Sequence, residues 1–338
     1  MKKICLGIFF ALTLCLLTAC SGSPREYSTD FFAMDTFMSI TAFGDGAEEG
    51  VKATARRVME LERLLSVTDE GSEIYALNSG RASSVSAETA ELIAFALDIA
   101  DRTGGTLDPT IYPVLRAWGF TTGEYSVPSA EELSGLLESV GYERVRADGD
   151  TIALSEGMML DLGAVAKGFA ADEAERILRG NGVTSALINL GGNIQLVGSK
   201  PDGSDWRLGL KDPSGEGNIG VLTVSDCAVV TSGSYERSFT APDGTVYGHI
   251  IDPASGIPVD NGLLSVTVIS DEGRLCDALS TALFVMGRDR ALEFRRENGG
   301  FDVILITDSG EVLITDGIAD DFTLDGAHSE LTVKVIEC

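Results

Sequence analysis

The sequence predicts an α+β fold in which a largely antiparallel sheet is flanked by helices. Apolar residues recur at helical spacing in 47–65 and 87–102, in the first half of the chain. Beyond Gly182 the pattern changes to short apolar runs separated by Gly, Asp and Asn, which is typical of strands joined by hairpin turns. Strands and helices do not alternate strictly, so a parallel sheet is not favoured.

The early elements follow from local signals. Residues 31–43 alternate in part and predict a strand, whereas 107–120 contain two prolines and predict a loop. Ser129 and Glu132 have the spacing of a capping box, so 129–140 should be a helix. A further helix should run from the stretch 161–172 to about Arg179.

The second half is expected to be mainly strands. One more helix is predicted at about 276–297, ahead of two last strands. The predicted strand segments are SALINL, IQLVG, WRLGLKD, GVLTVS, AVVTS, HIIDP, LLSVTVIS, FDVILIT and EVLIT.

The N-terminus has the features of a bacterial lipoprotein signal peptide, residues 1–19. A short basic segment precedes an apolar run too short to span a bilayer, which needs roughly 20 apolar residues. Cys20 directly after Thr-Ala resembles a lipobox, although an ordinary signal peptide with a chance Cys is the alternative. Lipidation at Cys20 would anchor the protein to the outer, extracytoplasmic face of the cell membrane, in the periplasm where two membranes are present.

Residues 20–30 are polar and are expected to form a tether, followed by one domain at 31–338 that could consist of two lobes. Cleavage before Cys20 leaves 319 residues with 23 basic and 52 acidic side chains, a net charge of −29. Such a surface repels phosphate backbones, so nucleic acid is excluded as a partner. An anionic ligand would need a local positive pocket or an accompanying cation.

The cysteines of the mature chain do not indicate a disulfide framework or a zinc site. Cys227, Cys276 and Cys338 form an odd set without close pairs.

The stretch DLGAVAKGFAAD (161–172) combines an acid, a glycine and a lysine at a predicted helix start. Asp161 stands where an N-cap belongs, and Gly163 permits close backbone approach. Lys167 lies one turn into the helix, off a stripe of small residues that includes Ala166 and Ala170. Free N–H groups and a lysine favour an anion such as a diphosphate. A capped helix with a solvated lysine is the alternative.

The segment CDALSTALFVMG (276–287) places three oxygen-bearing side chains on one helical face. Asp277, Ser280 and Thr281 stand at i, i+3 and i+4. Oxygen ligands of this kind suit magnesium, which keeps several waters and bridges substrate phosphates. Alternatively, the Asp balances the helix dipole and the hydroxyls bond to the backbone.

Three further stretches are candidate ligand walls. His249, on a predicted strand, could deprotonate a hydroxyl nucleophile or simply make a structural hydrogen bond. NLGGNIQLVG (189–198) has paired glycines that permit backbone approach or form only a hairpin. Trp118 and Phe120 could stack on a planar ring or cover the core.

Together these stretches resemble one family, the ApbE-type flavin transferases, or FAD:protein FMN transferases. The matching motifs occur in family order over about 250 residues, and a lipobox fits because many members are lipoproteins. They are AMDT (33–36), WGF (118–120), DLGAVAKGFAAD (161–172), NLGGNI (189–194), TSGSY (231–235), HIIDPASGIPV (249–259) and DALSTALFVMG (277–287).

The resemblance implies a magnesium-dependent enzyme that splits FAD, releases AMP and esterifies FMN to a threonine, or sometimes serine, hydroxyl of an acceptor protein. Family acceptors are subunits of sodium-pumping NADH:quinone reductase and of RNF complexes. The alternatives are an FAD diphosphatase that gives FMN and AMP, and a non-catalytic flavin-binding lipoprotein.

The resemblance also implies roles for individual residues. Catalysis would fall to His249, as base, and to Asp277. The implied FAD-binding residues are Met34, Thr68, Trp118, Gly119, Phe120, Asp161, Lys167 and Ile251. The implied magnesium ligands are Ala164 through its carbonyl, Asp277, Ser280 and Thr281. Ser280 stands where some members have a second Asp, and Thr68 where many have a Tyr.

Overall fold

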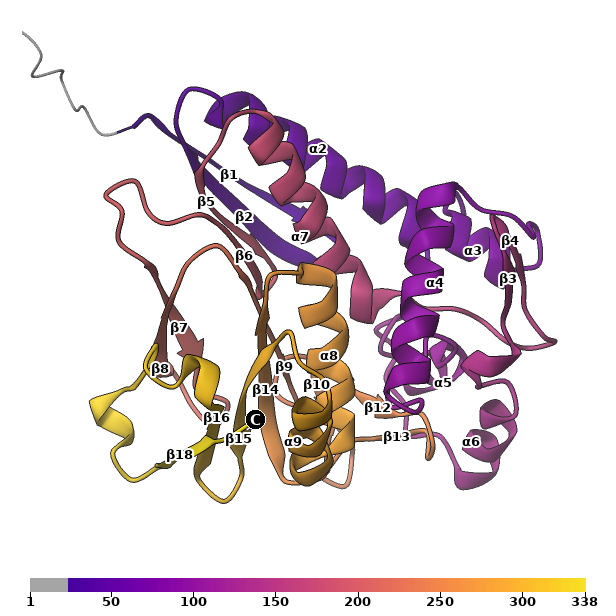
Figure 1. Cartoon of the computed structure of the whole chain (residues 1–338). Coiled ribbons are helices and arrows are strands. Elements are labelled where there is room, and N and C mark those ends of the chain that lie inside the picture. The colour runs from indigo at the N-terminus through magenta and orange to yellow at the C-terminus, as the bar shows by residue number, and fades with distance from the viewer. Residues whose placement is uncertain (1–23) are drawn as a thin grey trace, which may run out of the picture.

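A computed structural model describes residues 24–338, which form a large mixed sheet covered by helices (Figure 1). In the described chain the main sheet has nine strands in the order β1-β2-β5-β6-β9-β14-β15-β16-β18. Every neighbouring pair is antiparallel except β16 and β18. The strands are β1 (Glu26–Ala33), β2 (Thr36–Phe43), β5 (Ser185–Leu190), β6 (Asn193–Val197), β9 (Ala228–Gly233), β14 (Leu263–Ser270), β15 (Asp302–Thr307), β16 (Glu311–Thr315) and β18 (Thr332–Ile336).

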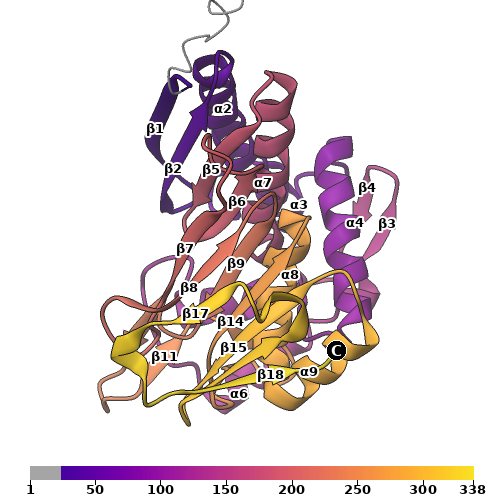
Figure 2. The ribbon, with the colours of Figure 1, turned by 60° about the vertical axis from the view of Figure 1, so that its left-hand side comes forward.

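Helices cover one face of this sheet and a small sheet packs on the other (Figure 2). The covering helices are α2 (Ala47–Leu65), α7 (Gly163–Gly180), α8 (Gly273–Met286) and α9 (Arg288–Glu297). The small sheet has the order β17-β8-β7, with β7 (Trp206–Lys211), β8 (Asn218–Val224) and β17 (Phe322–Leu324). Apolar side chains between the two sheets, such as Trp206, Leu222 and Ile304, form one of the buried clusters. The α+β fold with a mainly antiparallel sheet is confirmed.

A second group of elements lies beside α7 and α8 (Figure 1). It comprises α3 (Glu73–Asn78), α4 (Ala87–Arg102), α5 (Tyr112–Trp118), α6 (Ala130–Leu137), β3 (Arg146–Asp148) and β4 (Thr151–Ala153). Two short hairpins, β10 (Ser238–Thr240) with β11 (Val246–Gly248) and β12 (Ile251–Asp252) with β13 (Ile257–Pro258), lie after β9. Three short 3-10 helices complete the described elements: η1 (Tyr142–Arg144), η2 (Asp316–Ile318) and η3 (Gly326–His328).

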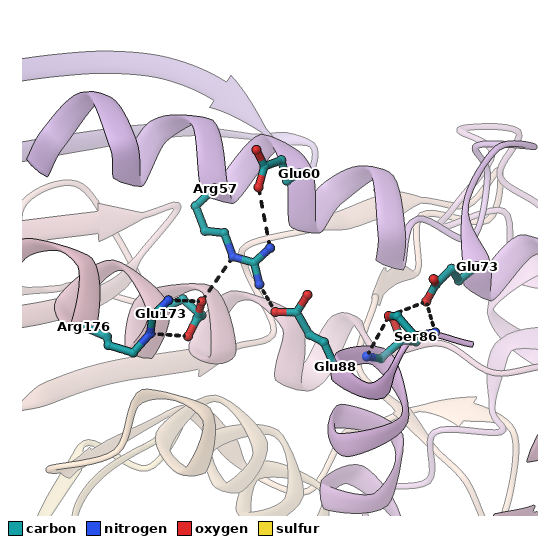
Figure 3. Close-up of polar contacts among 8 residues, drawn as sticks. Arg57, Glu60, Glu73, Ser86, Glu88, Glu173 and Arg176 are labelled. Atoms are coloured by element: carbon teal, nitrogen blue, oxygen red, sulfur yellow. Dashed lines mark hydrogen bonds and ion pairs between the residues drawn. The ribbon is translucent and has the colours of Figure 1, made fainter. Parts of the chain in front are cut away.

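One arginine ties α2 to the helices around it (Figure 3). Arg57 in α2 forms ion pairs with Glu88 in α4 and with Glu173 in α7, the latter at 3.1 Å, and lies 3.6 Å from Glu60. Glu173 also pairs with Arg176. Because the Arg57 and Glu173 side chains are about four-fifths buried, this network is screened less than a surface pair. It fixes α2 and α4 against α7, which carries the candidate site.

Three predicted elements differ from the structure. The strand expected at 31–43 is a hairpin of β1 and β2, and β1 begins at Glu26, within the expected tether. The expected loop 107–120 contains α5, whose first turn accommodates Pro113 because a first-turn residue needs no amide hydrogen. The single helix expected at 276–297 is two helices, broken at Gly287 with φ 77°.

Other predicted elements are confirmed. The helices at 47–65 and 87–102 have the expected bounds, and Ser129 caps α6 by accepting from the amide of Glu132 at 3.2 Å. Among residues 24–338 no helix combines the length and apolar character required to cross a membrane. The proposed signal peptide and Cys20 lie outside the described residues.

Candidate active site

A cavity of about 700 Å³ opens where the start of α7, the middle of α8 and several loops meet. Its wall also includes the β1–β2 and β5–β6 turns and the segment 249–253. Ten of the predicted site residues line it, although they are spread over nearly 250 positions of the sequence. They are Met34, Thr68, Phe120, Asp161, Ala164, Lys167, His249, Ile251, Asp277 and Thr281.

Helices α7 and α8 are joined at the cavity by reciprocal carboxylate–amide bonds. The Gly168 amide in α7 donates to Asp277 Oδ2 at 2.8 Å. In return, Asp172 of α7 accepts from the amides of Gly273 and Arg274 at 2.6 and 3.1 Å and so caps the start of α8. Burial raises the pKa of Asp172 to about 6.

The helices approach so closely because residue 168 has no side chain. A Cβ at Gly168 would lie 2.4 Å from the carbonyl oxygen of Gly273 and 2.7 Å from the Asp277 Cβ. Only a glycine therefore allows this crossing, which sets the position of Asp277 relative to α7.

The start of α7 forms another part of the wall. Asp161 accepts from the amide of Gly163 at 2.6 Å, and Leu162, not Asp161, is the N-cap residue. Asp161 still satisfies one free amide of the first turn. Burial raises the pKa of Asp161, while the Gly163 amide and the charges of Lys167 and Arg237 act against that rise. Ala166, Ala170 and Ala174 are buried, and Lys167 lies off this stripe of small residues, 27% exposed, in the cavity wall.

The donor set at the α7–α8 junction fits a cation shared with a ligand. Asp277 is 4% exposed, and its Oδ1 lies 3.8 Å from Lys167 Nζ. The Thr281 hydroxyl is one helical turn further along α8, and Ala164 lies in the first turn of α7. Within residues 24–338 no three His, Cys, Asp or Glu side chains cluster to hold a metal by themselves. One carboxylate, one hydroxyl and one carbonyl leave positions for water or phosphate oxygens, as magnesium prefers.

His249 lies in the wall between β11 and β12, not within a strand as predicted. Its amide donates to the Arg237 carbonyl at 2.9 Å, and its Nδ1 lies 3.3 Å from the same oxygen. Since a carbonyl only accepts, this contact assigns the ring proton to Nδ1 and leaves Nε2 basic. Burial, with the charges of Arg237 and Lys167, lowers the pKa of His249 to about 4. The imidazole is therefore neutral at pH 7.

Three predicted site residues do not line the cavity. Trp118 is 2% exposed and donates from Nε1 to the Gly256 carbonyl at 2.8 Å, so its ring packs in a buried cluster. Gly119 ends α5 with φ 84°. Ser280 is fully buried, and its hydroxyl bonds to Ser232 and to the Asp277 carbonyl. Because these bonds hold the Ser280 side chain inside the protein, Ser280 is not part of the cavity wall.

Two features of the wall have no local signal in the sequence, namely the positive φ values of the β1–β2 turn and the position of Arg237. Met34 and Asp35 form the β1–β2 turn with φ values of 48° and 58°, a conformation that favours Gly or Asn. The Met34 amide donates to Glu62 Oε1 at 2.8 Å, which holds this turn against α2. Arg237 reaches the Asp35 carbonyl at 3.3 Å and adds positive charge to the wall. Its role depends on a contact across 202 residues, which no local pattern could indicate.

The fold and the cavity define an α+β protein with a polar site suited to a phosphorylated ligand and a divalent cation. Comparison with known proteins identifies the family: residues 34–305 match the model of the ApbE family, and the chain belongs to it.

Named relatives agree with this membership. The chain is 32% identical over 350 residues to the FAD:protein FMN transferase of Treponema pallidum, covering 95% of this chain and 96% of that protein. It is 36% identical over 276 residues to an FAD:protein FMN transferase of Klebsiella pneumoniae, covering 78% and 85%.

Solved structures show the same fold. The ApbE protein of Thermotoga maritima superposes with a TM-score of 0.82 at 32% identity, covering 88% of this chain and 99% of that one. The flavin transferase ApbE of Vibrio cholerae gives 0.77 at 26% identity, covering 91% and 99%. The resemblance to flavin transferases predicted from the motifs is thus confirmed.

Proposed function

We propose that the protein transfers FMN from FAD to a threonine or serine hydroxyl of an acceptor protein and releases AMP. Membership of a family whose relatives are named FAD:protein FMN transferases supports this activity. The observation that carries it is the convergence of Lys167, Asp277 and Thr281 with the start of α7 on one cavity of about 700 Å³. That volume is within the range of cofactor sites.

In this proposal the diphosphate of FAD lies against the start of α7. Lys167 supplies positive charge, and the free amides of the first turn favour an anion. Met34, Thr68, Phe120, Asp161 and Ile251 contact the rest of the dinucleotide, which their positions in the wall support. The wall itself has more carboxylates than cations, so the proposed magnesium ion, together with Lys167, would be needed to offset the repulsion of a phosphorylated substrate.

Asp277, Thr281 and the Ala164 carbonyl would hold magnesium. Bound there, the ion would neutralise charge that grows on the departing AMP as the phosphorus–oxygen bond breaks. Asp277 is suited to this role because Gly168 and α7 fix its Oδ2, which leaves Oδ1 towards Lys167.

His249 would accept the proton of the acceptor hydroxyl as its oxygen bonds to the FMN phosphorus. The imidazole is neutral and its Nε2 is free to accept a proton, which supports this role, and the pKa lowered to about 4 makes it a weaker base than a free imidazole. Subunits of sodium-pumping NADH:quinone reductase or of RNF complexes are the proposed acceptors. Cys20 is the proposed lipid attachment site, which would place the enzyme on the extracytoplasmic face of the membrane.

The test is to incubate the chain from residue 24 with FAD, magnesium and such a subunit, and to weigh the acceptor by mass spectrometry. We expect the acceptor to gain one FMN phosphoester, and an acceptor with its target threonine changed to alanine to gain none. Free FMN and AMP with an unmodified acceptor would indicate a diphosphatase instead, and FAD retained without turnover would indicate a binding protein.

A further inference from the structure

Three hydroxyl groups form a chain behind the proposed cation site. Ser232, at the end of β9, lies with its Oγ 2.9 Å from Ser280 Oγ and 3.3 Å from Thr281 Oγ1. Ser280 Oγ lies 3.0 Å from the carbonyl oxygen of Asp277. Ser232 and Thr281 line the cavity, whereas Ser280 is fully buried behind them.

The number of protons available fixes which hydroxyl donates and which accepts in each of these hydrogen bonds. Each hydroxyl has one proton to donate, and a carbonyl oxygen can only accept. Ser280 therefore donates to the Asp277 carbonyl and must accept from Ser232. Ser232 has then used its proton, so the contact with Thr281 requires Thr281 to donate.

The consequence is that the proton of Thr281 points towards Ser232, while both lone pairs of its oxygen stay free on the other sides. A hydroxyl binds a hard cation through a lone pair, with its proton directed away from the ion. Thr281 lines the same cavity as Asp277 and Ala164. The hydrogen bonds through Ser232 and Ser280 therefore orient the Thr281 oxygen to bind a cation, and its proton is not available to a ligand in the cavity.

We infer that Ser232 and Ser280 are positioning residues that orient the Thr281 hydroxyl for a divalent cation, and that neither binds the ion. Ser280, predicted as a ligand, thus acts through Ser232 and Thr281. The inference rests on the proposed function, because the cation is the one that accompanies the diphosphate. Outer partners that orient a metal ligand typically change metal affinity by about 10–100-fold when removed.

A neighbouring hydroxyl pair provides a matched control. Thr231 Oγ1 and Thr267 Oγ1 lie 2.8 Å apart on β9 and β14, next to Ser232, and neither contacts Thr281 in the hydrogen bonds of the described chain. Thr267 is 1% exposed, so Thr267→Val removes a buried hydroxyl bond from the same strands without touching the chain of three.

The experiment measures the dissociation constant of Mg²⁺ by calorimetry on protein saturated with ADP, a diphosphate that carries no flavin, and subtracts the same Mg²⁺ titration into ADP alone, because ADP itself binds Mg²⁺. We expect Ser280→Ala and Ser232→Ala each to weaken Mg²⁺ binding about 10-fold or more. Ser232→Thr, which keeps the hydroxyl, and Thr267→Val should bind Mg²⁺ like the wild type. Thermal unfolding without metal checks that each variant folds.

The outcomes separate the inference from the proposed function. If the wild type binds Mg²⁺ with ADP and both alanine variants bind it equally well, the inference is wrong and the proposed function is untouched. If the wild type binds no Mg²⁺ in the presence of ADP, the proposed cation site itself is wrong. A purely structural role would lower the melting temperature of Ser280→Ala and Thr267→Val alike, with no change in the Mg²⁺ dissociation constant.

Discussion

Replacing Gly168 by alanine perturbs the crossing of α7 and α8 on which the site depends. The new Cβ would lie 2.4 Å from the Gly273 carbonyl oxygen, whereas ordinary contact begins at 3.4 Å, so the helices must part by 1.0 Å or shift sideways. Overpacking of this kind costs about 1–3 kcal/mol. The shift also moves Asp277, and a misplacement of about 1 Å in an active site can cost about 100-fold in rate.

Gly180, in the last turn of α7, is the matched control. A Cβ there would meet nothing within 4 Å, so Gly180→Ala should gain about 0.5–1 kcal/mol from helix propensity alone. We expect Gly168→Ala to unfold at a lower temperature than Gly180→Ala and to transfer FMN about 100-fold more slowly, measured by calorimetry and by acceptor mass. Equal melting temperatures and equal rates for the two variants would refute the close crossing and its role in placing Asp277.

Three further changes should have separable effects. Asp277→Ala should abolish FMN transfer while the circular dichroism spectrum stays native, and transfer at the wild-type rate with saturating magnesium would contradict the assigned role. His249→Gln tests the lowered pKa of His249. In the unfolded state this histidine binds a proton below pH 6.5, whereas in the folded state it binds one only near pH 4. The wild type should therefore lose stability relative to the variant as the pH falls from 6.5 to about 4. Urea titrations at several pH values measure the difference, and parallel curves for wild type and His249→Gln would exclude the effect. Arg57→Leu removes the partner of Glu173 and should lower the free energy of unfolding by about 1–2 kcal/mol in urea, allowing for partial exposure; an unchanged midpoint would show that the network contributes nothing.

Local patterns predicted the elements whose signals are complete in the sequence. The helix at 87–102 has helical periodicity and a capping serine, Ser86, that accepts from the Thr89 amide. The β1–β2 turn was missed because Met34 and Asp35 adopt positive φ without a Gly or Asn to indicate it. The prediction of a loop around Pro113 was wrong because a helix tolerates proline in its first turn, and the sequence pattern did not show that Pro113 stands there.

The candidate site was predictable in its residues and less so in its arrangement. Asp161, Lys167 and Asp277 stand in motifs, and the fold brings them to one cavity. Ser280 shares a helical face with Asp277 in the sequence, but its hydroxyl turns inward because Ser232 on a strand and a carbonyl offer it partners. Such orientations follow from tertiary neighbours, which a single helix pattern does not contain.

The central claim is that Lys167 and a cation bound at the α7–α8 junction bind the diphosphate of FAD for transfer. The reaction itself provides the most direct test of this claim. The measurement is the amount of AMP released for each flavinylated acceptor, with magnesium and again with a chelator. One AMP per modified acceptor with magnesium, and neither product with the chelator, is the predicted result. Flavinylation that continues unchanged in the chelator, or AMP released without any modified acceptor, would contradict it.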